Sequence, residues 1–287
     1  MTPQDLLTSW IRRQAPPDAA QWLDTRLVAL AAGAPERDLV IALGFIPRRL
    51  GKADLVLDEA DLAAAQAARQ GWDPTGWSLD QAARLALLLA SHDGDEAAFA
   101  RRIDSLCQTG DVGELVAFYR GLPLYPGQSH LQARAREGVR SGMRPVFEAV
   151  AHRNPYPREQ FDEEAWNQMV VKAFFIGSEL WPIQGLDERR NADLARMLVD
   201  LAHERRAAAR PVSPELWRCV GRFADAAMLE DLAQVLKSEN EPERRAAALA
   251  LADCPKPEAR AILVKVPELE RAVADRRLDW SMVRTLS

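Results

Sequence analysis

Residues 78–90 read SLDQAARLALLLA, and this stretch decides the fold class. Ser78 and Gln81 are spaced as a capping box, the pattern that opens an α-helix. The helix after them is made almost entirely of alanine and leucine, which are strong helix formers. A similar run, RAAALALA, occupies residues 245–252. Each run is followed by a loop and a further alanine-rich helix, so the sequence predicts an all-α protein.

Composition agrees with this fold class. Hydrophobic residues make up 48% of the 287-residue chain, and alanine is the commonest of them. Valine and isoleucine rarely alternate with polar residues, so no strands are expected. Helix starts are marked at Thr2-Pro3, Asp58, Asp162 and Ser213-Pro214. Joints rich in proline and glycine are expected to break the helices at residues 44–54, 71–77, 121–128, 154–158 and 177–187.

The spacing R-x-A-A-x-x-A-L within helix pairs is typical of HEAT-like repeats, which stack into solenoids. We therefore expect an irregular HEAT-like helical repeat or α-solenoid-like bundle, with a compact orthogonal bundle as the alternative. Residues 1–287 are expected to form a single helical unit. Its expected parts are an N-terminal helical part (1–125), a polar-aromatic motif region (126–218) and a HEAT-like C-terminal part (219–287).

Charge and cysteine content narrow the function classes. The net charge is −5 with a pI of about 5.6, whereas a nucleic-acid binder usually carries a basic balance. The three cysteines are far apart and form neither a disulfide framework nor a CxxC metal site. A cytoplasmic location fits this pattern. The N-terminus has no apolar signal core, and no apolar run is long enough for membrane insertion.

Residues 154–218 interleave aromatic residues, amides, charges and prolines more densely than the alanine-rich helices around them. His203-Glu204 begins an HExxH-like sequence, but the second histidine of that zinc motif is missing. Asp200, His203 and Glu204 share one helical face. Three roles for His203 are compatible with this spacing. The histidine is buried and held by carboxylates or arginines, contacts a ligand, or contributes to a metal site; no metal is assigned.

The helix expected after Asp162 carries Trp166 and Asn167, and Lys172 lies on its flank. A lysine in an apolar helix acts as a nucleophile when its pKa is shifted. More often it reaches solvent along its alkyl chain or pairs with a carboxylate, here Asp187 or Glu204.

The remaining candidates are turn, helix-start and aromatic residues. Asn154 and Tyr156 lie in an NPYP turn, where an asparagine typically bonds nearby backbone amides. Asp187, Arg190 and Asn191 precede a helix, and such an N-terminus is either a capped end or a seat for phosphate. Trp217 belongs to an aromatic group that forms either core or a pocket wall.

Motifs of common enzymes are missing from the sequence. It contains no GxGxxG, GxxxxGK[ST] or GxSxG motif and no DxD-type magnesium pair. No cofactor is therefore expected, and the pattern leans away from an enzyme without excluding one.

Several longer motifs carry a family resemblance. In chain order they are PRRLGKADL (47–55), GWDPTGWSLDQAARLALLL (71–89), GELVAFYRGLPLYP (113–126), NPYP (154–157), FDEEAWNQMVVKAFF (161–175), GLDERRN (185–191), LARMLVDLAHER (194–205) and PVSPELWR (211–218). The chain resembles the EboA family in these motifs over about residues 1–260. It departs from the family pattern at Arg206, where an aromatic residue is usual.

The resemblance implies a genomic and metabolic context, and it assigns no catalytic residue. Proteins of this family are encoded beside a UbiA-like prenyltransferase, a sugar-phosphate cyclase, a TatD-like hydrolase and a TIM-barrel protein, and are linked to making or moving a secondary metabolite. The missing catalytic motifs and the concave surface of a solenoid favour a non-enzymatic accessory protein of such a pathway, which binds a pathway enzyme or metabolite through residues 154–218. The alternative is an enzyme acting on a cyclitol-like or prenylated metabolite with His203, Glu204 and Lys172 in a cleft.

Overall fold

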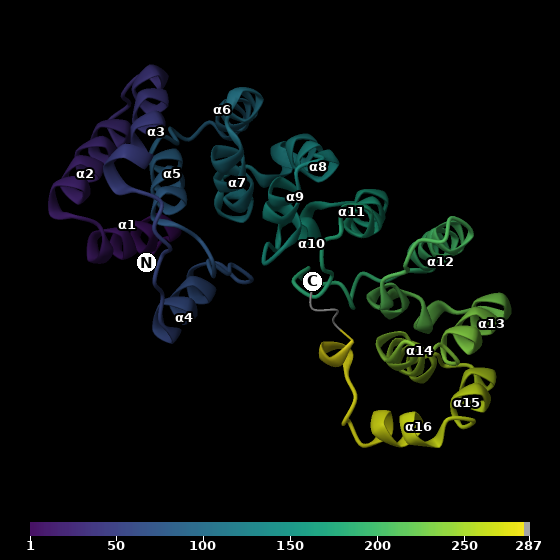
Figure 1. The fold of residues 1–287 in the computed structure, drawn as a ribbon. Coiled ribbons are helices and arrows are strands. Elements are labelled where there is room, and N and C mark those ends of the chain that lie inside the picture. Colours follow the sequence, from purple (N-terminus) through teal and green to yellow (C-terminus); the bar gives the residue numbers. More distant parts are fainter. Residues whose placement is uncertain (284–287) are drawn as a thin grey trace. The chain divides into compact units, whose positions relative to one another are not determined.

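The computed structural model describes residues 1–283 of the chain (Figure 1). Helices make up most of the described residues, and no strand occurs among them, which confirms the all-α prediction. Two isolated antiparallel β-bridges occur in this part of the chain, between Asp54 and Ser78 and between His152 and Ile183. The last four positions of the expected C-terminal part, 284–287, lie outside the described residues.

The chain divides into two compact units. Unit 1 contains residues 1–162 and 182–184, and unit 2 contains residues 163–181 and 185–287. The three-part subdivision and the HEAT-like repeat expected from the sequence stay predictions.

Unit 1 contains helices α1 to α10 and two short 3₁₀ helices. Their bounds are α1 (Pro3–Gln14), α2 (Pro17–Ala31), α3 (Glu36–Leu50), α4 (Glu59–Ala68), α5 (Leu79–Ala90), α6 (Glu96–Thr109), α7 (Val112–Arg120), η1 (Leu122–Leu124), η2 (Gln128–Leu131), α8 (Gln132–Arg140), α9 (Arg144–Ala151) and α10 (Tyr156–Gln160).

Helix α5 is the centre of unit 1. It packs against α1, α2, α3 and α7, and Leu85, Leu87 and Leu88 are completely buried. A helix that is apolar on every side needs such a surround. Its two charged residues, Asp80 and Arg84, are buried as an ion pair one turn apart. The run quoted first from the sequence is therefore the core helix of its unit.

Unit 2 contains helices α11 to α16 and three 3₁₀ helices. Their bounds are α11 (Glu163–Ile176), α12 (Ala192–Ala207), η3 (Pro214–Cys219), η4 (Gly221–Phe223), α13 (Ala226–Val235), α14 (Glu241–Asp253), α15 (Pro257–Leu263), α16 (Pro267–Ala274) and η5 (Trp280–Met282).

Helix α14, which contains the second alanine-rich run, is the central helix of unit 2, as α5 is of unit 1. It packs against η3, η4, α13, α15 and α16. Small side chains allow a close approach, and at Gly221 an added Cβ would overlap the backbone of Ala250. The two runs noticed in the sequence thus form the central helices of the two units.

Helix starts follow the caps read from the sequence. Thr2 and Asp58 each form a capping box with the residue three positions on, and α11 begins directly after Asp162. Ser213-Pro214 also opens a helix, of the 3₁₀ type.

The expected joint at residues 44–54 contains the end of α3, at Leu50 with Gly51 as its C-cap. Pro47 itself does not break the helix, because α3 continues through it. Proline inside a helix costs about 3 kcal/mol. Leu43, Ile46 and Leu50 are buried on one side of α3, and their burial outweighs that cost at about 1.5–3 kcal/mol per side chain.

Among the described residues, no helix combines the length and the apolar character needed to cross a membrane.

Candidate functional site

The NPYP turn lies in unit 1, and both of its candidate residues are buried. The Asn154 side-chain amide donates to the carbonyls of Tyr119 at 3.1 Å and Ala149 at 3.0 Å. Its side-chain oxygen accepts from the backbone N–H of Tyr156 at 3.0 Å, as turn chemistry predicts. The Tyr156 hydroxyl donates to the carbonyl of Gln128 at 2.6 Å. Both side chains therefore join backbone segments of unit 1.

The other candidate residues lie in unit 2. They are Trp166, Asn167, Lys172, Asp187, Arg190, Asn191, His203, Glu204 and Trp217.

Two asparagines connect α11 to the start of α12. Asn167 and Asn191 each donate an amide hydrogen to the other's side-chain oxygen, at 3.1 and 2.8 Å. The Asn191 oxygen also accepts from the N–H of Leu194, so Asn191 is the N-cap of α12. Beside this pair, the Arg189 guanidinium lies 4.7 Å from the centre of the fully buried Trp166 ring. The start of α12 is therefore a capped end, and a phosphate seat at the same helix start stays a prediction.

The GLDERRN loop is held by paired charges. Arg218 donates to both carboxylate oxygens of Asp187, from Nε at 2.9 Å and from Nη2 at 2.6 Å. Burial alone would raise the pKa of Asp187, but the hydrogen bonds and charge of Arg218 outweigh it and hold the pKa below its usual value. Arg190 donates to Asp253 of α14 and to the carbonyl of Arg218, both at 2.7 Å. Arg190 and Arg218 thus bind carboxylates within unit 2.

His203 lies on the surface of α12, with 53% of its side chain exposed, so the interpretation as a buried histidine is wrong. Its Nε2 contacts both carboxylate oxygens of Asp231 on α13, at 2.8 and 2.9 Å. Arg206, the residue at which the chain departs from the family pattern, approaches Asp231 to 3.5 Å. Its guanidinium also lies 5.4 Å from the ring centre of the buried Trp217. Glu204 is exposed on the same helix.

Lys172 is half-buried on α11. Within residues 1–283 it forms no ion pair, so the expected pairing with Asp187 or Glu204 is not formed there.

The structure brings part of the predicted set together around η3. Trp217 contacts Arg206 of α12, and the next residue, Arg218, binds Asp187 of the loop. Asn154 and Tyr156 belong to unit 1, so they are described separately from this group.

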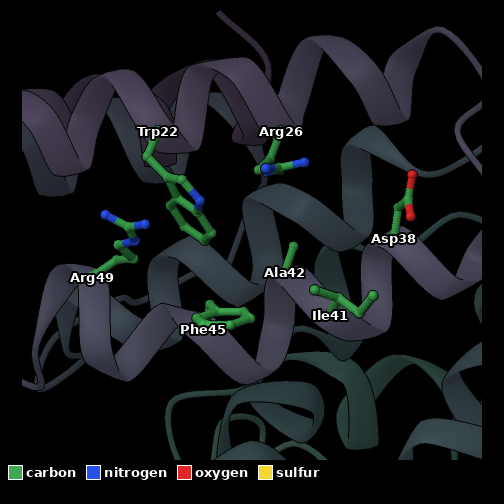
Figure 2. A pocket seen from close by; sticks show the side chains of 7 residues that line it. All are labelled: Trp22, Arg26, Asp38, Ile41, Ala42, Phe45 and Arg49. Carbon is green, nitrogen blue, oxygen red and sulfur yellow. The ribbon is translucent and has the colours of Figure 1, made fainter.

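A pocket of about 200 Å³ lies between α2 and α3 of unit 1. Figure 2 shows Trp22 extending from α2 toward Phe45 and Ala42 of α3, with Arg49 beside the indole. The Arg49 guanidinium is 5.9 Å from the Trp22 ring centre, a cation–π distance. Arg26 also lines the pocket, and neither arginine forms an ion pair among the described residues. Sequence reasoning did not single out these residues, since their helical spacing equals that of core residues.

A second pocket in unit 1 encloses about 180 Å³ and is more polar. Its lining includes Thr75, Trp77, Arg120, Glu148, His152 and Arg153. Thr75, Trp77 and Arg120 lie inside motifs that carried the family resemblance, and His152 and Arg153 directly precede NPYP. The position of these residues next to the quoted motifs was the signal that could have identified them.

Two further findings bear on chemistry. In unit 2, a cavity of about 520 Å³ lies among α14, α15 and α16, with Cys254, Lys256 and Arg260 on its lining.

Among the described residues, no cluster of three or more histidine, cysteine, aspartate or glutamate side chains is arranged to hold a metal ion.

Comparison with known protein families matches residues 3–221 to the family described as "Metabolite traffic protein EboA". Comparisons with curated proteins and with solved structures give no match. The family match covers α1 to η3 and ends at the first residue of η4. Since it extends over most of the chain, the protein belongs to the EboA family.

Proposed function

We propose that the protein is a non-enzymatic accessory protein of a secondary-metabolite pathway. It docks a protein of that pathway through the region of residues 154–218, by the exposed surfaces of α11 and α12. The family description, which refers to metabolite traffic, supports an accessory role.

Phe175, near the end of α11, is the observation that carries this proposal. It exposes 58% of its surface, whereas its neighbour Phe174 exposes 9%. Lys172, one turn earlier, forms no ion pair within residues 1–283. On α12, which packs against α11, Met197 exposes 37%. Interfaces concentrate binding energy in large apolar anchors that a partner desolvates, and Phe175 has that character.

The paired polar side chains support a binding role over a catalytic one. Nucleophilic or acid–base catalysis needs a base within hydrogen-bond reach of the group that it activates. His203 pairs with Asp231, but among the described residues no serine, threonine, cysteine or lysine side chain is hydrogen-bonded to it. Asp187 is held by Arg218, and Lys172 forms no ion pair in this part of the chain. Such pairs stabilise the local fold and keep the surrounding surface rigid, which lowers the entropy cost of docking.

The partners that we propose follow from the family resemblance. They are the UbiA-like prenyltransferase, the sugar-phosphate cyclase, the TatD-like hydrolase and the TIM-barrel protein encoded with the family. A metabolite carried between two of them is a compatible cargo.

Binding to each of these four purified partners tests the proposal by biolayer interferometry. We expect one partner to bind, and Phe175→Ser and Lys172→Glu each to weaken binding by about tenfold or more, as loss of an interface anchor does. Val264→Ser is the matched control, because Val264 is an exposed apolar residue elsewhere in unit 2. Its affinity should equal that of the wild type.

Two results would overturn the proposal. The first is that none of the four partners binds, or that Phe175→Ser binds as the wild type does. The second is that the wild-type protein converts a cyclitol-like or prenylated metabolite, and that His203→Ala and Lys172→Ala each lose this activity while their melting temperatures are unchanged. That result would establish the enzyme alternative.

A further inference from the structure

The polar pocket of unit 1 is formed where four segments of chain meet. They are the loop before α5, the end of α7, helix α9 and the two residues that follow α9. Because separate segments supply the lining, its side chains are held by the packing of the whole unit rather than by one flexible loop.

Arg120, the last residue of α7, lines this pocket. Its Nη1 donates to the carbonyl of Gly76 at 2.8 Å and to the side-chain oxygen of Gln81 at 2.5 Å. Both acceptors are neutral, and Arg120 forms no ion pair among the described residues. Two carbonyl oxygens therefore fix the orientation of the guanidinium and leave its charge available.

Arg153 brings a second guanidinium to the same space. Its backbone φ is +48°, the left-handed region that a residue other than glycine rarely adopts. Its N–H donates to the carbonyl of Pro182 at 2.9 Å, which holds this conformation. Strained backbone of this kind is concentrated at functional sites.

The two arginines repel each other. Burial lowers the pKa of Arg120, and the charge of Arg153 lowers it further, while Glu148 acts in the opposite direction. Glu148 accepts a hydrogen bond from Arg144 at 2.7 Å, and Asp73 lies 3.4 Å from Arg153. Arg144 and Asp73 lie outside the lining, which contains two arginines, Arg120 and Arg153, and one carboxylate, Glu148, so the formal charge of these lining groups is positive.

We propose that this pocket binds the phosphate or carboxylate group of a small anionic metabolite, with Arg120 and Arg153 as the charged donors. Thr75 and His152 add polar groups to the lining, and Trp77 forms an apolar wall for the rest of the molecule. The volume of about 180 Å³ corresponds to about six water molecules, enough for one such group. Guanidinium groups suit both anions, because their paired N–H donors match two oxygens at once. The site lies in unit 1 and does not depend on the docking proposed for α11 and α12.

The test uses the full chain with two probes, inorganic phosphate followed by ³¹P NMR and acetate followed by ¹³C NMR. We expect saturable binding of one probe per chain, and the stronger probe identifies the anionic group. Arg153→Asn removes the charge but keeps a residue that tolerates positive φ. This variant and Arg120→Gln should weaken binding by about tenfold or more, as loss of a charge-assisted hydrogen bond does.

Arg49→Gln is the matched control, because Arg49, like Arg120, forms no ion pair among the described residues of unit 1, but lines the α2–α3 pocket. Its binding should equal that of the wild type. The inference is overturned if neither probe binds saturably, or if Arg49→Gln loses binding while Arg153→Asn keeps it. Melting temperatures of each variant, with and without probe, separate loss of binding from loss of folding: at ten times Kd the probe should raise the wild-type value by about 4 °C.

Discussion

Replacement of Asn154 separates a structural role from a ligand-binding one at the NPYP turn. The side chain is 3% exposed and makes three hydrogen bonds to backbone groups. In Asn154→Ala, the carbonyls of Tyr119 and Ala149 and the N–H of Tyr156 each lose a partner. A buried polar group left without its partner costs about 1–3 kcal/mol. We use the lower value, because the Tyr119 carbonyl also accepts from Gly121.

The expected destabilisation is therefore about 3 kcal/mol. For a unit of this size, each kcal/mol lowers the melting temperature by about 2–4 °C, which predicts a fall of about 6–12 °C. Asn154→Asp keeps the shape but directs a carboxylate oxygen at the carbonyls of Tyr119 and Ala149, where an N–H donated before. At neutral pH it should destabilise at least as much as alanine does.

Circular dichroism during thermal unfolding measures both variants. Gln21→Ala, an exposed change in α2, is the control and should stay within about 0.5 kcal/mol of the wild type. If both Asn154 variants melt within about 1 °C of the wild type, the three hydrogen bonds do not stabilise unit 1 and the reasoning is refuted.

Three further measurements test other features. The pKa of Asp187 is lowered in the folded state. Its pairing with Arg218 therefore stabilises the folded protein above the unfolded-state pKa of about 3.9, and this stabilisation is lost as pH falls through the lower folded-state pKa. Urea unfolding from neutral to acidic pH should show a loss of unfolding free energy of up to about 1 kcal/mol, and this loss should be absent in Asp187→Asn. Gly221→Ala, whose Cβ would overlap the backbone of α14, should destabilise by about 1–3 kcal/mol. In Gly44→Ala, at an open position inside α3, thermal unfolding should instead show a gain of about 0.5–1 kcal/mol. Burial raises the pKa of Cys219 to about 12, so iodoacetamide at pH 8 should modify this thiol only in urea; modification of the folded protein would contradict its burial.

Much of the fold was predictable from short-range patterns. The caps at Thr2 and Asp58 each bond a backbone N–H three residues away, so a few residues of sequence contain the whole interaction. The exception, Pro47, shows where such reasoning fails. The cost of a proline is a property of the helix alone. The burial of the other residues of α3 depends on the helices of unit 1 that pack against it.

Less of the candidate sites was predictable. The sequence placed His203 on one face with Asp200 and Glu204, but its partner is Asp231 on another helix. Arg120 and Arg153 were not identified as a pair, although both lie in or beside quoted motifs. Each pocket lining combines residues from several segments, and a pattern within one segment cannot show which other segments it will meet.

The sequence by itself determined the helical class, the helix starts at Thr2, Asp58, Ser78, Asp162 and Ser213, and the two runs that became α5 and α14, because propensity and capping act within one or two turns. Only the tertiary structure decided which polar groups are partners. Asn167 binds a residue 24 positions away, His203 one 28 positions away and Arg190 one 63 positions away. Such pairs form where packed helices bring distant side chains within hydrogen-bond distance, and helix packing depends on the shape of the whole buried surface.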